Sequence, residues 1–413
     1  MLVTNGKRRR VVITGMDALS CLGDNLPEIS ESLRLGRSGI VISKEREELG
    51  FRSALTGAIK PIDPTAHFAR KERKSMGETA LYAAIAARKA VAMSNCAELL
   101  RSDRAGVLFG NDSCAEPIEE ILATVRQTKS TGSLGSDKVI KALNSTATIN
   151  LGPMFGTRGI SMSLSGACSS GAHAIGWAWM LISSDMHDMC ITGGSQELCW
   201  QSMAAFDGLR VFSMRTDNPA GSVRPFDRDR DGLVPGGGSA CLILEEYEHA
   251  KRRGAKILAE VVSYAFNSDG DHMTSGDGKG AARCMVNALD LAGLKPQQID
   301  YINAHATATE AGDAAEAFAI NRVFGENGPL VSSTKSLTGH ECWMAGASEA
   351  LYSILMMHGN FIAPNRNFEN YDPRIPKINI APKTVEDVKL KYILSNSFGF
   401  GGTNACLILG QVD

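Results

Sequence analysis

Short apolar runs rich in β-branched residues alternate with longer helical segments along the whole chain. The predicted strands span residues 10–15, 106–110, 160–165, 189–193, 240–245, 255–263, 300–304, 330–334, 391–396 and 404–409. The predicted helices span residues 78–93, 169–183, 280–292, 313–324 and 346–358. This alternation, with continuous apolar runs in the strands, predicts an α/β protein whose largely parallel sheets are covered by helices on both faces.

The last two predicted strands are joined by a short glycine-rich loop, Phe398–Gly402, which is typical of a hairpin. A comparable pair of β-rich runs lies at residues 189–195 and 238–247. The repeated pair predicts two similar halves within one compact body. The predicted division is an N-terminal extension without an assigned role at 1–10, a first half at 11–254 and a second half at 255–413.

Charge and hydropathy exclude several classes of function. Lys and Arg number 43 and Asp and Glu number 45, so the formal net charge of −2 gives no reason to expect nucleic-acid binding. No apolar run reaches the roughly 18 residues of a membrane-spanning helix, and the run after the basic N-terminus is too short for a secretion signal. The 10 cysteines follow neither disulfide nor zinc-site spacing, which favours reduced thiols in a cytoplasmic protein without membrane insertion.

The segment Ser161–Met180 carries the strongest chemical signal. An apolar strand ends at Gly166, Cys168 follows two residues later, and a helix rich in small residues opens at Ser169. The N–H groups and dipole of a helix N-terminus favour a thiolate, so we expect a lowered pKa for this thiol. The small residues predict a central, buried helix. From this segment alone, an inert core cysteine is an equally good interpretation.

Two histidines lie at junctions between strands and helices. His305 stands in YINAHATATEAGD, and His340 stands in SSTKSLTGHECWMAGASE, which also contains Lys335. Sites in α/β proteins form beyond the carboxyl ends of strands, although a single histidine is more often packed or solvent-facing. The glycine loop around Phe400 offers backbone N–H groups for an oxyanion hole.

Four segments occur in order between residues 168 and 404: SGACSS, HATAT, TKSLTGH and NSFGFGGTN. They resemble the motifs of the β-ketoacyl-acyl-carrier-protein synthases, condensing enzymes of the thiolase-like fold, and VVITGM and PFDRDRDG extend the likeness to almost the whole chain. The resemblance is strongest to the elongating synthases of dissociated bacterial fatty-acid synthesis. It implies two similar βαβαβαββ halves in a layered α-β-α-β-α arrangement.

The resemblance implies a decarboxylative Claisen condensation in fatty-acid, polyene or polyketide elongation. Cys168 would take the acyl chain from acyl carrier protein as a thioester, and the backbone N–H groups of Cys168 and Phe400 would form the oxyanion hole. After malonyl carrier protein loses CO₂, neutral His305 and His340 would donate hydrogen bonds to the enolate. The product would be 3-oxoacyl carrier protein.

Further roles follow from the same resemblance. Lys335 is expected to orient the histidine region and to hydrogen-bond Glu316, with a surface salt bridge as the alternative. No organic cofactor and no catalytic metal are expected. The other implied residues are Thr307 and Thr309 for the phosphopantetheine arm, Phe400 for gating, Phe206 and Ser113 for the acyl tunnel, and Asn303, Glu349 and Asn396 for a structural monovalent cation.

Acyl carrier proteins are acidic, so the resemblance also implies a basic docking patch and, separately, a homodimer. A solvated charged face is the alternative interpretation of such a patch. The expected patch residues are Arg70, Lys71, Arg73 and Lys74, extended by Arg126 and Lys129.

The sequence departs from the family pattern beside both histidines. Ala306, Ala308 and Glu310 stand where Gly, Ser and Pro are more familiar, and Trp343 is bulky for its place. These changes leave acyl chain length and pathway open. A degradative thiolase and a chalcone-synthase-like enzyme are disfavoured, because the glycine loop lacks a second cysteine and both histidines are present. The alternative function is a non-elongating chain-length partner of another synthase, against which Cys168 argues.

Overall fold

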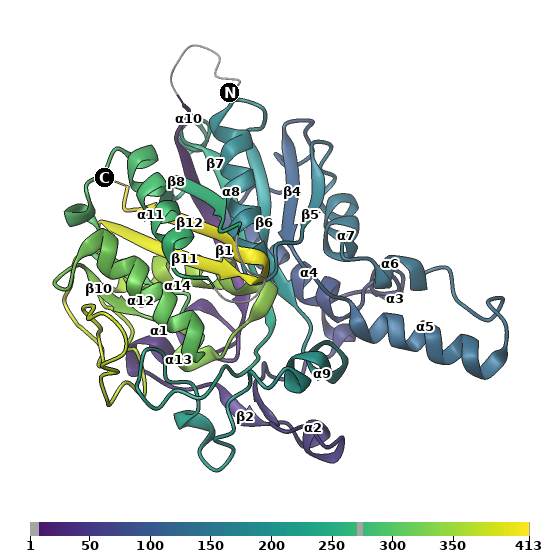
Figure 1. Cartoon of the computed structure of the whole chain (residues 1–413). Helices are drawn as coiled ribbons and strands as arrows, with labels where there is room; N and C mark the ends of the chain where they lie inside the picture. Colours follow the sequence, from purple (N-terminus) through teal and green to yellow (C-terminus); the bar gives the residue numbers. More distant parts are fainter. Residues whose placement is uncertain (1–7, 271–275, 413) are drawn as a thin grey trace.

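The computed structural model describes residues 8–270 and 276–412 (Figure 1). The first half contains β1 (Val11–Leu19), α1 (Leu26–Leu35), β2 (Ile40–Ile42), α2 (Lys44–Glu48), β3 (Leu55–Gly57), α3 (Arg70–Arg73), α4 (Glu78–Ser94), β4 (Ala105–Gly110), α5 (Ala115–Thr128), α6 (Lys138–Ala142), α7 (Thr146–Phe155), β5 (Ser161–Leu164), α8 (Ser170–Ser183), β6 (Met189–Gln196), α9 (Trp200–Gly208), β7 (Gly238–Glu246) and α10 (Tyr247–Arg252). The second half contains β8 (Ala259–Ser268), α11 (Lys279–Ala292), β9 (Tyr301–Asn303), α12 (Glu310–Phe324), β10 (Leu330–Ser332), α13 (Lys335–Thr338), α14 (Ala345–Gly359), β11 (Tyr392–Gly399) and β12 (Thr403–Gly410).

The long strands form one sheet in the order β10-β9-β11-β12-β8-β1-β7-β6-β4-β5. Read outward from the centre, β1-β7-β6-β4-β5 corresponds strand by strand to β8-β12-β11-β9-β10. The pairs of β4 with β5 and β6 are parallel, as are those of β9 with β10 and β11. The antiparallel pairs are β1–β7, β1–β8, β6–β7, β8–β12 and β11–β12. The prediction of largely parallel sheets is therefore wrong except for the outer three strands of each half, because the hairpin-like returns reverse the inner strands.

Helices separate the two halves of the sheet into layers. α8 and α14 pack against each other, α8 against β4 and β6 and α14 against β7 and β11 (Figure 1). α4 and α7 cover the outer face of the first half, and α11, backed by α12, covers that of the second. The predicted layered α-β-α-β-α, thiolase-like arrangement is confirmed. The predicted division near residue 255 falls in the connection between α10 and β8.

Two glycines bring the middle helices unusually close together. A Cβ atom at Gly346 of α14 would lie 2.6 Å from Cβ of Ala172, and one at Gly171 of α8 would lie 3.0 Å from the backbone nitrogen of Ala347. A side chain at Gly346 would force a neighbour to shift, and one at Gly171 would have very little room. The predicted central, buried α8 is confirmed, and its N-terminus is held beside the segment that precedes α14.

The end of the predicted N-terminal extension is fixed to the body of the protein. Arg9 forms an ion pair with Asp188 at 2.8 Å, and Arg10 forms one with Glu260 at 2.5 Å. The last two residues of the predicted extension thus contact the body of the protein, while residues 1–7 lie outside the described residues. None of the described helices has the length and apolar character needed to cross a membrane.

Candidate active site

Cys168 lies on a tight turn between β5 and α8. Ala167 has a φ of 49°, in the left-handed region that residues with a side chain rarely adopt. Hydrogen bonds hold this conformation: the Ala167 N–H donates to Asp112 at 2.9 Å, and the Gly166 N–H donates to Oγ of Ser170 at 2.9 Å. The strained turn thus fixes where the sulfur points.

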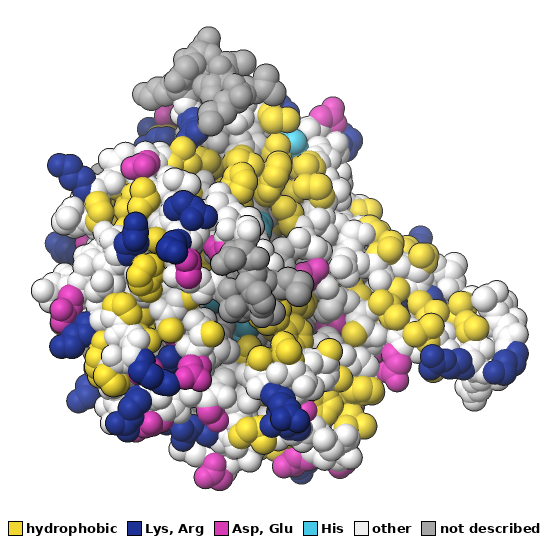
Figure 2. All heavy atoms as spheres, viewed as in Figure 1, with side chains coloured by type: hydrophobic (Ala, Val, Ile, Leu, Met, Phe, Trp, Pro, Cys, Tyr) yellow, Lys and Arg dark blue, Asp and Glu magenta, His cyan; other side chains and the backbone are white. Residues whose placement is uncertain are grey.

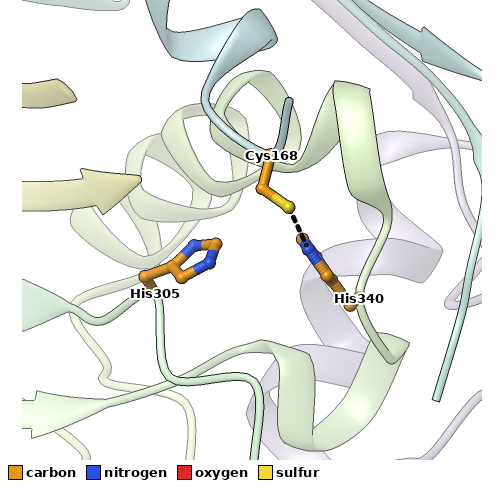
Figure 3. A group of neighbouring side chains, drawn as sticks. All are labelled: Cys168, His305 and His340. Atoms are coloured by element: carbon orange, nitrogen blue, oxygen red, sulfur yellow. Dashed lines mark hydrogen bonds between the residues drawn. The ribbon is translucent and has the colours of Figure 1, made fainter. Parts of the chain in front are cut away.

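The structure brings Cys168, His305 and His340 together (Figure 3). One side-chain N or S atom from each residue lies within 4.8 Å of the other two, and Nε2 of His340 lies 2.9 Å from Sγ of Cys168. The two imidazole rings are 5.3 Å apart between centroids and nearly perpendicular, at 88°. Among residues 8–270 and 276–412, these three also form the only His, Cys, Asp and Glu cluster arranged to hold a metal ion.

Both imidazoles are neutral at ordinary pH. Burial lowers the pKa of His305 and of His340 well below 6.5, and the positive charge of Lys335 lowers both further. In each ring Nδ1 is buried without a hydrogen-bond partner among the described residues. A neutral ring with hydrogen on Nε2 can donate to an oxygen placed between the histidines and the sulfur.

The expected lowering of the Cys168 pKa is wrong. Burial raises the pKa of this thiol to about 12, because an apolar surrounding disfavours the thiolate. The charge of Lys335 and the N–H groups of Cys168 and Phe400 act in the opposite direction. The helix N-terminus therefore does not outweigh desolvation, and the resting sulfur is a neutral thiol.

Lys335 has a different partner from the predicted one. It is buried on α13 and forms an ion pair with Glu349 of α14, so the hydrogen bond to Glu316 and the surface salt bridge are both wrong. Glu316 instead accepts the N–H groups of His305 at 2.9 Å and Ala306 at 2.7 Å. The carboxylate on α12 thus holds the backbone that carries His305, and Lys335 acts on the histidines through its charge.

The three residues implied for a structural cation do not converge through their side chains. Asn303 pairs in register with Ser395, and its amide donates to the carbonyl oxygen of Glu349 at 3.4 Å. Asn396 is the next residue along β11, so its side chain lies on the opposite face of the sheet, where it donates to Glu316 at 3.0 Å. Of these three residues, only Glu349 has a buried side-chain oxygen, Oε2, without a hydrogen-bond partner in the part of the chain that the structure describes.

The catalytic cluster opens into a cavity of about 390 Å³. Four of the predicted substrate residues line it: Thr307, Thr309, Phe206 and Phe400. Oγ1 of Thr307 lies 3.1 Å from Oγ1 of Thr309. Ser113 does not line the cavity. Lining residues without a sequence signal are Met203, Phe212, Leu233 and Cys342, because an apolar side chain facing a cavity looks in sequence like one facing the core.

The glycine loop after β11 is fixed against the Cys168 turn. Ser169 donates through Oγ to the carbonyl oxygens of Ser397 at 3.0 Å and Thr403 at 2.9 Å, at the two ends of the loop. A Cβ atom at Gly399 would lie 2.8 Å from the carbonyl oxygen of Gly166. This close contact directs the Phe400 N–H toward the sulfur. Sequence patterns do not reveal Ser169, whose contacts lie more than 200 residues away.

The first part of the predicted carrier-protein patch lies on and beside α3. Arg70, Lys71 and Lys74 are exposed, whereas Arg73 is partly buried. Arg73 lines a second cavity of about 330 Å³ together with Glu116, near the start of α5. Three of the four predicted cations are therefore free to meet a partner.

The second part of the patch lies at the end of α5, which protrudes as an arm in Figure 1. Arg126 and Lys129 are both exposed, and Figure 2 shows basic side chains gathered near the tip of the arm. Ten residues separate Arg126 from Glu116, which is about 15 Å along a helix. The two groups of cations are thus spread along the arm and its base.

Comparison with known proteins agrees with this geometry. The family models "Beta-ketoacyl synthase, N-terminal domain" and "Beta-ketoacyl synthase, C-terminal domain" match residues 8–250 and 258–369. A 3-oxoacyl-[acyl-carrier-protein] synthase 1 from Haemophilus influenzae is 40% identical over 403 residues, covering 97% of this chain and 98% of the relative.

Solved structures give the same result. A β-ketoacyl synthase from Burkholderia phymatum is 38% identical with a TM-score of 0.93, covering 98% of this chain and 100% of that one. A type II polyketide ketosynthase, solved in complex with its acyl-carrier protein, is 29% identical with a TM-score of 0.89 and the same coverage. The chain belongs to the β-ketoacyl synthase family.

Proposed function

We propose that this chain condenses an acyl group, held as a thioester on Cys168, with malonyl carrier protein to give 3-oxoacyl carrier protein, CO₂ and the free thiol. The observation that carries the proposal is the convergence of Sγ with two neutral imidazoles within 4.8 Å at the wall of a cavity. A chain-length partner without catalysis needs no such convergence. The site therefore favours the enzyme.

The first half-reaction exchanges one thioester for another. The Cys168 sulfur attacks the carbonyl carbon of the incoming acyl thioester, and the pantetheine sulfur leaves with the thiol proton. The N–H groups of Cys168 and Phe400, which already point at Sγ, stabilise the negative oxygen of the tetrahedral intermediate. Nε2–H of His340 stabilises the developing thiolate, and Thr307 and Thr309, which line the cavity, hold the pantetheine arm.

The second half-reaction forms the new carbon–carbon bond. Malonyl carrier protein loses CO₂, and the electron pair of the broken bond passes into an enolate whose oxygen accepts Nε2–H of His305 and His340. The enolate carbon then attacks the acyl carbonyl, and the Cys168 thiolate leaves and takes up a proton. Lys335 keeps both imidazoles neutral, because a nearby positive charge disfavours imidazolium.

Mass spectrometry of the intact protein tests this proposal. After incubation with an acyl carrier-protein thioester, the mass is expected to rise by one acyl group located on Cys168. Adding malonyl carrier protein is expected to remove the adduct and release a 3-oxoacyl product. An unmodified protein that nevertheless changes the product length of a partner synthase would favour the chain-length role instead.

We infer that the exposed cations near α3 and at the end of α5 receive the acidic carrier protein. The KM for carrier-protein substrates is expected to rise several-fold as salt is increased, whereas the KM for small thioester mimics stays nearly constant, because salt screens exposed charges. Lys71→Glu is expected to raise the carrier-protein KM as well, with Lys295→Glu, an exposed lysine outside the patch, as the control. If the KM values for carrier-protein substrates and for small mimics changed equally with salt, the inferred docking patch would be contradicted.

We also infer a homodimer built on the outer edge of the sheet. β5 is the last strand, so one side of it is unpaired, and a second copy can supply a pairing strand. Met162 on β5 and Trp177 on the adjacent α8 are exposed by 37% and 38%. Light scattering is expected to give twice the chain mass, and Met162→Asp is expected to shift the protein toward monomer while Val41→Asp on β2 does not. A wild-type monomer would contradict the inference.

A further inference from the structure

A single large side chain, Trp343, lies directly behind residues that line the catalytic cavity. Phe206 and Cys342 line the cavity on this side. Trp343 follows Cys342 directly, and its ring centroid lies 6.2 Å from that of Phe206. It is 7% exposed and belongs to the same apolar cluster as Cys168. The indole therefore fills the space behind the wall that faces the sulfur.

Hydrogen bonds fix the indole in this position. Nε1–H of Trp343 donates to Oγ of Ser113 at 3.0 Å, and Ser113 donates in turn to Oε1 of Glu197 at 2.9 Å. Glu197 is buried at the end of β6 and also accepts the N–H of Ala115 at 2.8 Å. An apolar chain that advanced past the indole would thus meet a buried carboxylate, which disfavours further penetration.

The backbone beneath Trp343 has no room to withdraw. A Cβ atom at Gly194 of β6 would lie 2.7 Å from Cα of Met344 and 2.9 Å from the carbonyl oxygen of Trp343. One at Gly171 of α8 would lie 3.1 Å from the same carbonyl oxygen. The turn Cys342–Met344 is therefore wedged between β6 and α8, and a longer ligand cannot be accommodated by moving it back.

We propose that Trp343 sets the upper limit on the length of the acyl chain that Cys168 accepts. The proposal rests on the proposed condensing function, and it restricts the acyl donors to chains that end before the Phe206–Trp343 pair. Each further methylene would have to displace packed aromatic atoms. Forcing one extra methylene into a filled pocket lowers a rate by roughly 10- to 200-fold, so the limit is expected to be sharp.

Acylation of Cys168 by a graded series of saturated acyl carrier-protein thioesters tests the proposal. For the wild type, the acylation rate is expected to fall steeply beyond one chain length. For Trp343→Ala, the cut-off is expected to move to longer chains, with the ratio of long-chain to short-chain rates rising at least about tenfold. Trp343→Phe, which keeps most of the bulk, is expected to stay near the wild type.

Controls separate the effect of volume from other effects. Leu209→Ala enlarges the same cavity where it meets solvent, at a side chain that is 53% exposed, and is expected to leave the cut-off unchanged. Ser113→Ala removes the acceptor of the indole N–H and a donor to Glu197 but leaves the indole volume unchanged, so it is expected to move the cut-off less than Trp343→Ala. If Trp343→Ala does not fold, Trp343→Leu provides the same comparison with a smaller expected shift.

The experiment distinguishes failure of the proposed role of Trp343 from failure of the proposed condensing function. An unchanged cut-off in folded Trp343→Ala or Trp343→Leu, with normal acylation by short donors, would overturn the role of Trp343 and leave the condensing function intact. Failure of the wild type to form any acyl adduct would instead overturn the proposed function.

Discussion

Cys168→Ala is expected to abolish condensation while CO₂ release from malonyl carrier protein persists. Removing Sγ eliminates the only atom that holds the acyl chain, so neither an acyl adduct nor a 3-oxoacyl product can form. The two imidazoles that stabilise the enolate come from other segments, after β9 and after α13, and remain in place. Acetyl carrier protein is then the expected product, because the enolate is protonated when no acyl thioester is available.

The comparison requires two measurements on one sample: release of labelled CO₂ and the chain length of the products. Cys342→Ala is the matched control, since this second cysteine lines the same cavity and is expected to leave the adduct on Cys168. Persisting condensation in Cys168→Ala, or a simultaneous loss of decarboxylation in a folded variant, would contradict the assigned division of labour.

His340→Ala is expected to slow decarboxylation by roughly 10²–10³-fold, which corresponds to the loss of one donor worth about 2.7–4 kcal/mol in a preorganised site. Acylation is expected to suffer less, because the N–H groups of Cys168 and Phe400 still stabilise its intermediate. His340→Gln restores an N–H donor and is expected to recover part of the rate. Similar decarboxylation rates in the wild type and His340→Ala would contradict the proposed role of His340 in stabilising the enolate.

The pH dependence provides an independent check on the histidines. The pKa values of His305 and His340 lie well below 6.5, so both rings stay neutral as the pH falls through 6.5 and become protonated only at more acid values. Decarboxylation by the wild type is therefore expected to show no loss with an apparent pKa near 6.5. An inflection at that pH in the rate would indicate imidazoles that are not desolvated as described.

The residues that meet in the catalytic cluster were predictable because their segments occur in the order of a known family's motifs, whereas the local pattern alone left an inert cysteine as an equally good interpretation. Cys168 ends a strand and begins a helix, and His305 and His340 lie in motifs at the ends of strands. Local pattern does not say which charged residue meets which across the fold. The pairing of Lys335 with Glu349, in place of Glu316, depends on how α13 packs against α14.

Quantities set by tertiary burial were not predictable in the same way. The helix N-terminus beside Cys168 is visible in the sequence. The desolvation that raises the pKa of the Cys168 thiol to about 12 depends instead on the apolar side chains that pack around it. For the fold, apolar periodicity located the strands of the main sheet, whereas strand direction required the pairing partners. The helices α5 and α7 were not predicted; α7 contains Pro153, a residue that normally ends a helix.

The contact of α8 with α14 through Gly171 and Gly346 has a further consequence. Each half of the chain carries only part of the catalytic groups: the sulfur of Cys168 belongs to the first half, and the imidazoles of His305 and His340 belong to the second. Neither repeat is chemically competent alone, and a shift of one helix along the other by a fraction of an ångström changes the reacting distance directly. The spacing of the reacting groups therefore depends on two glycines that do not line the catalytic cavity.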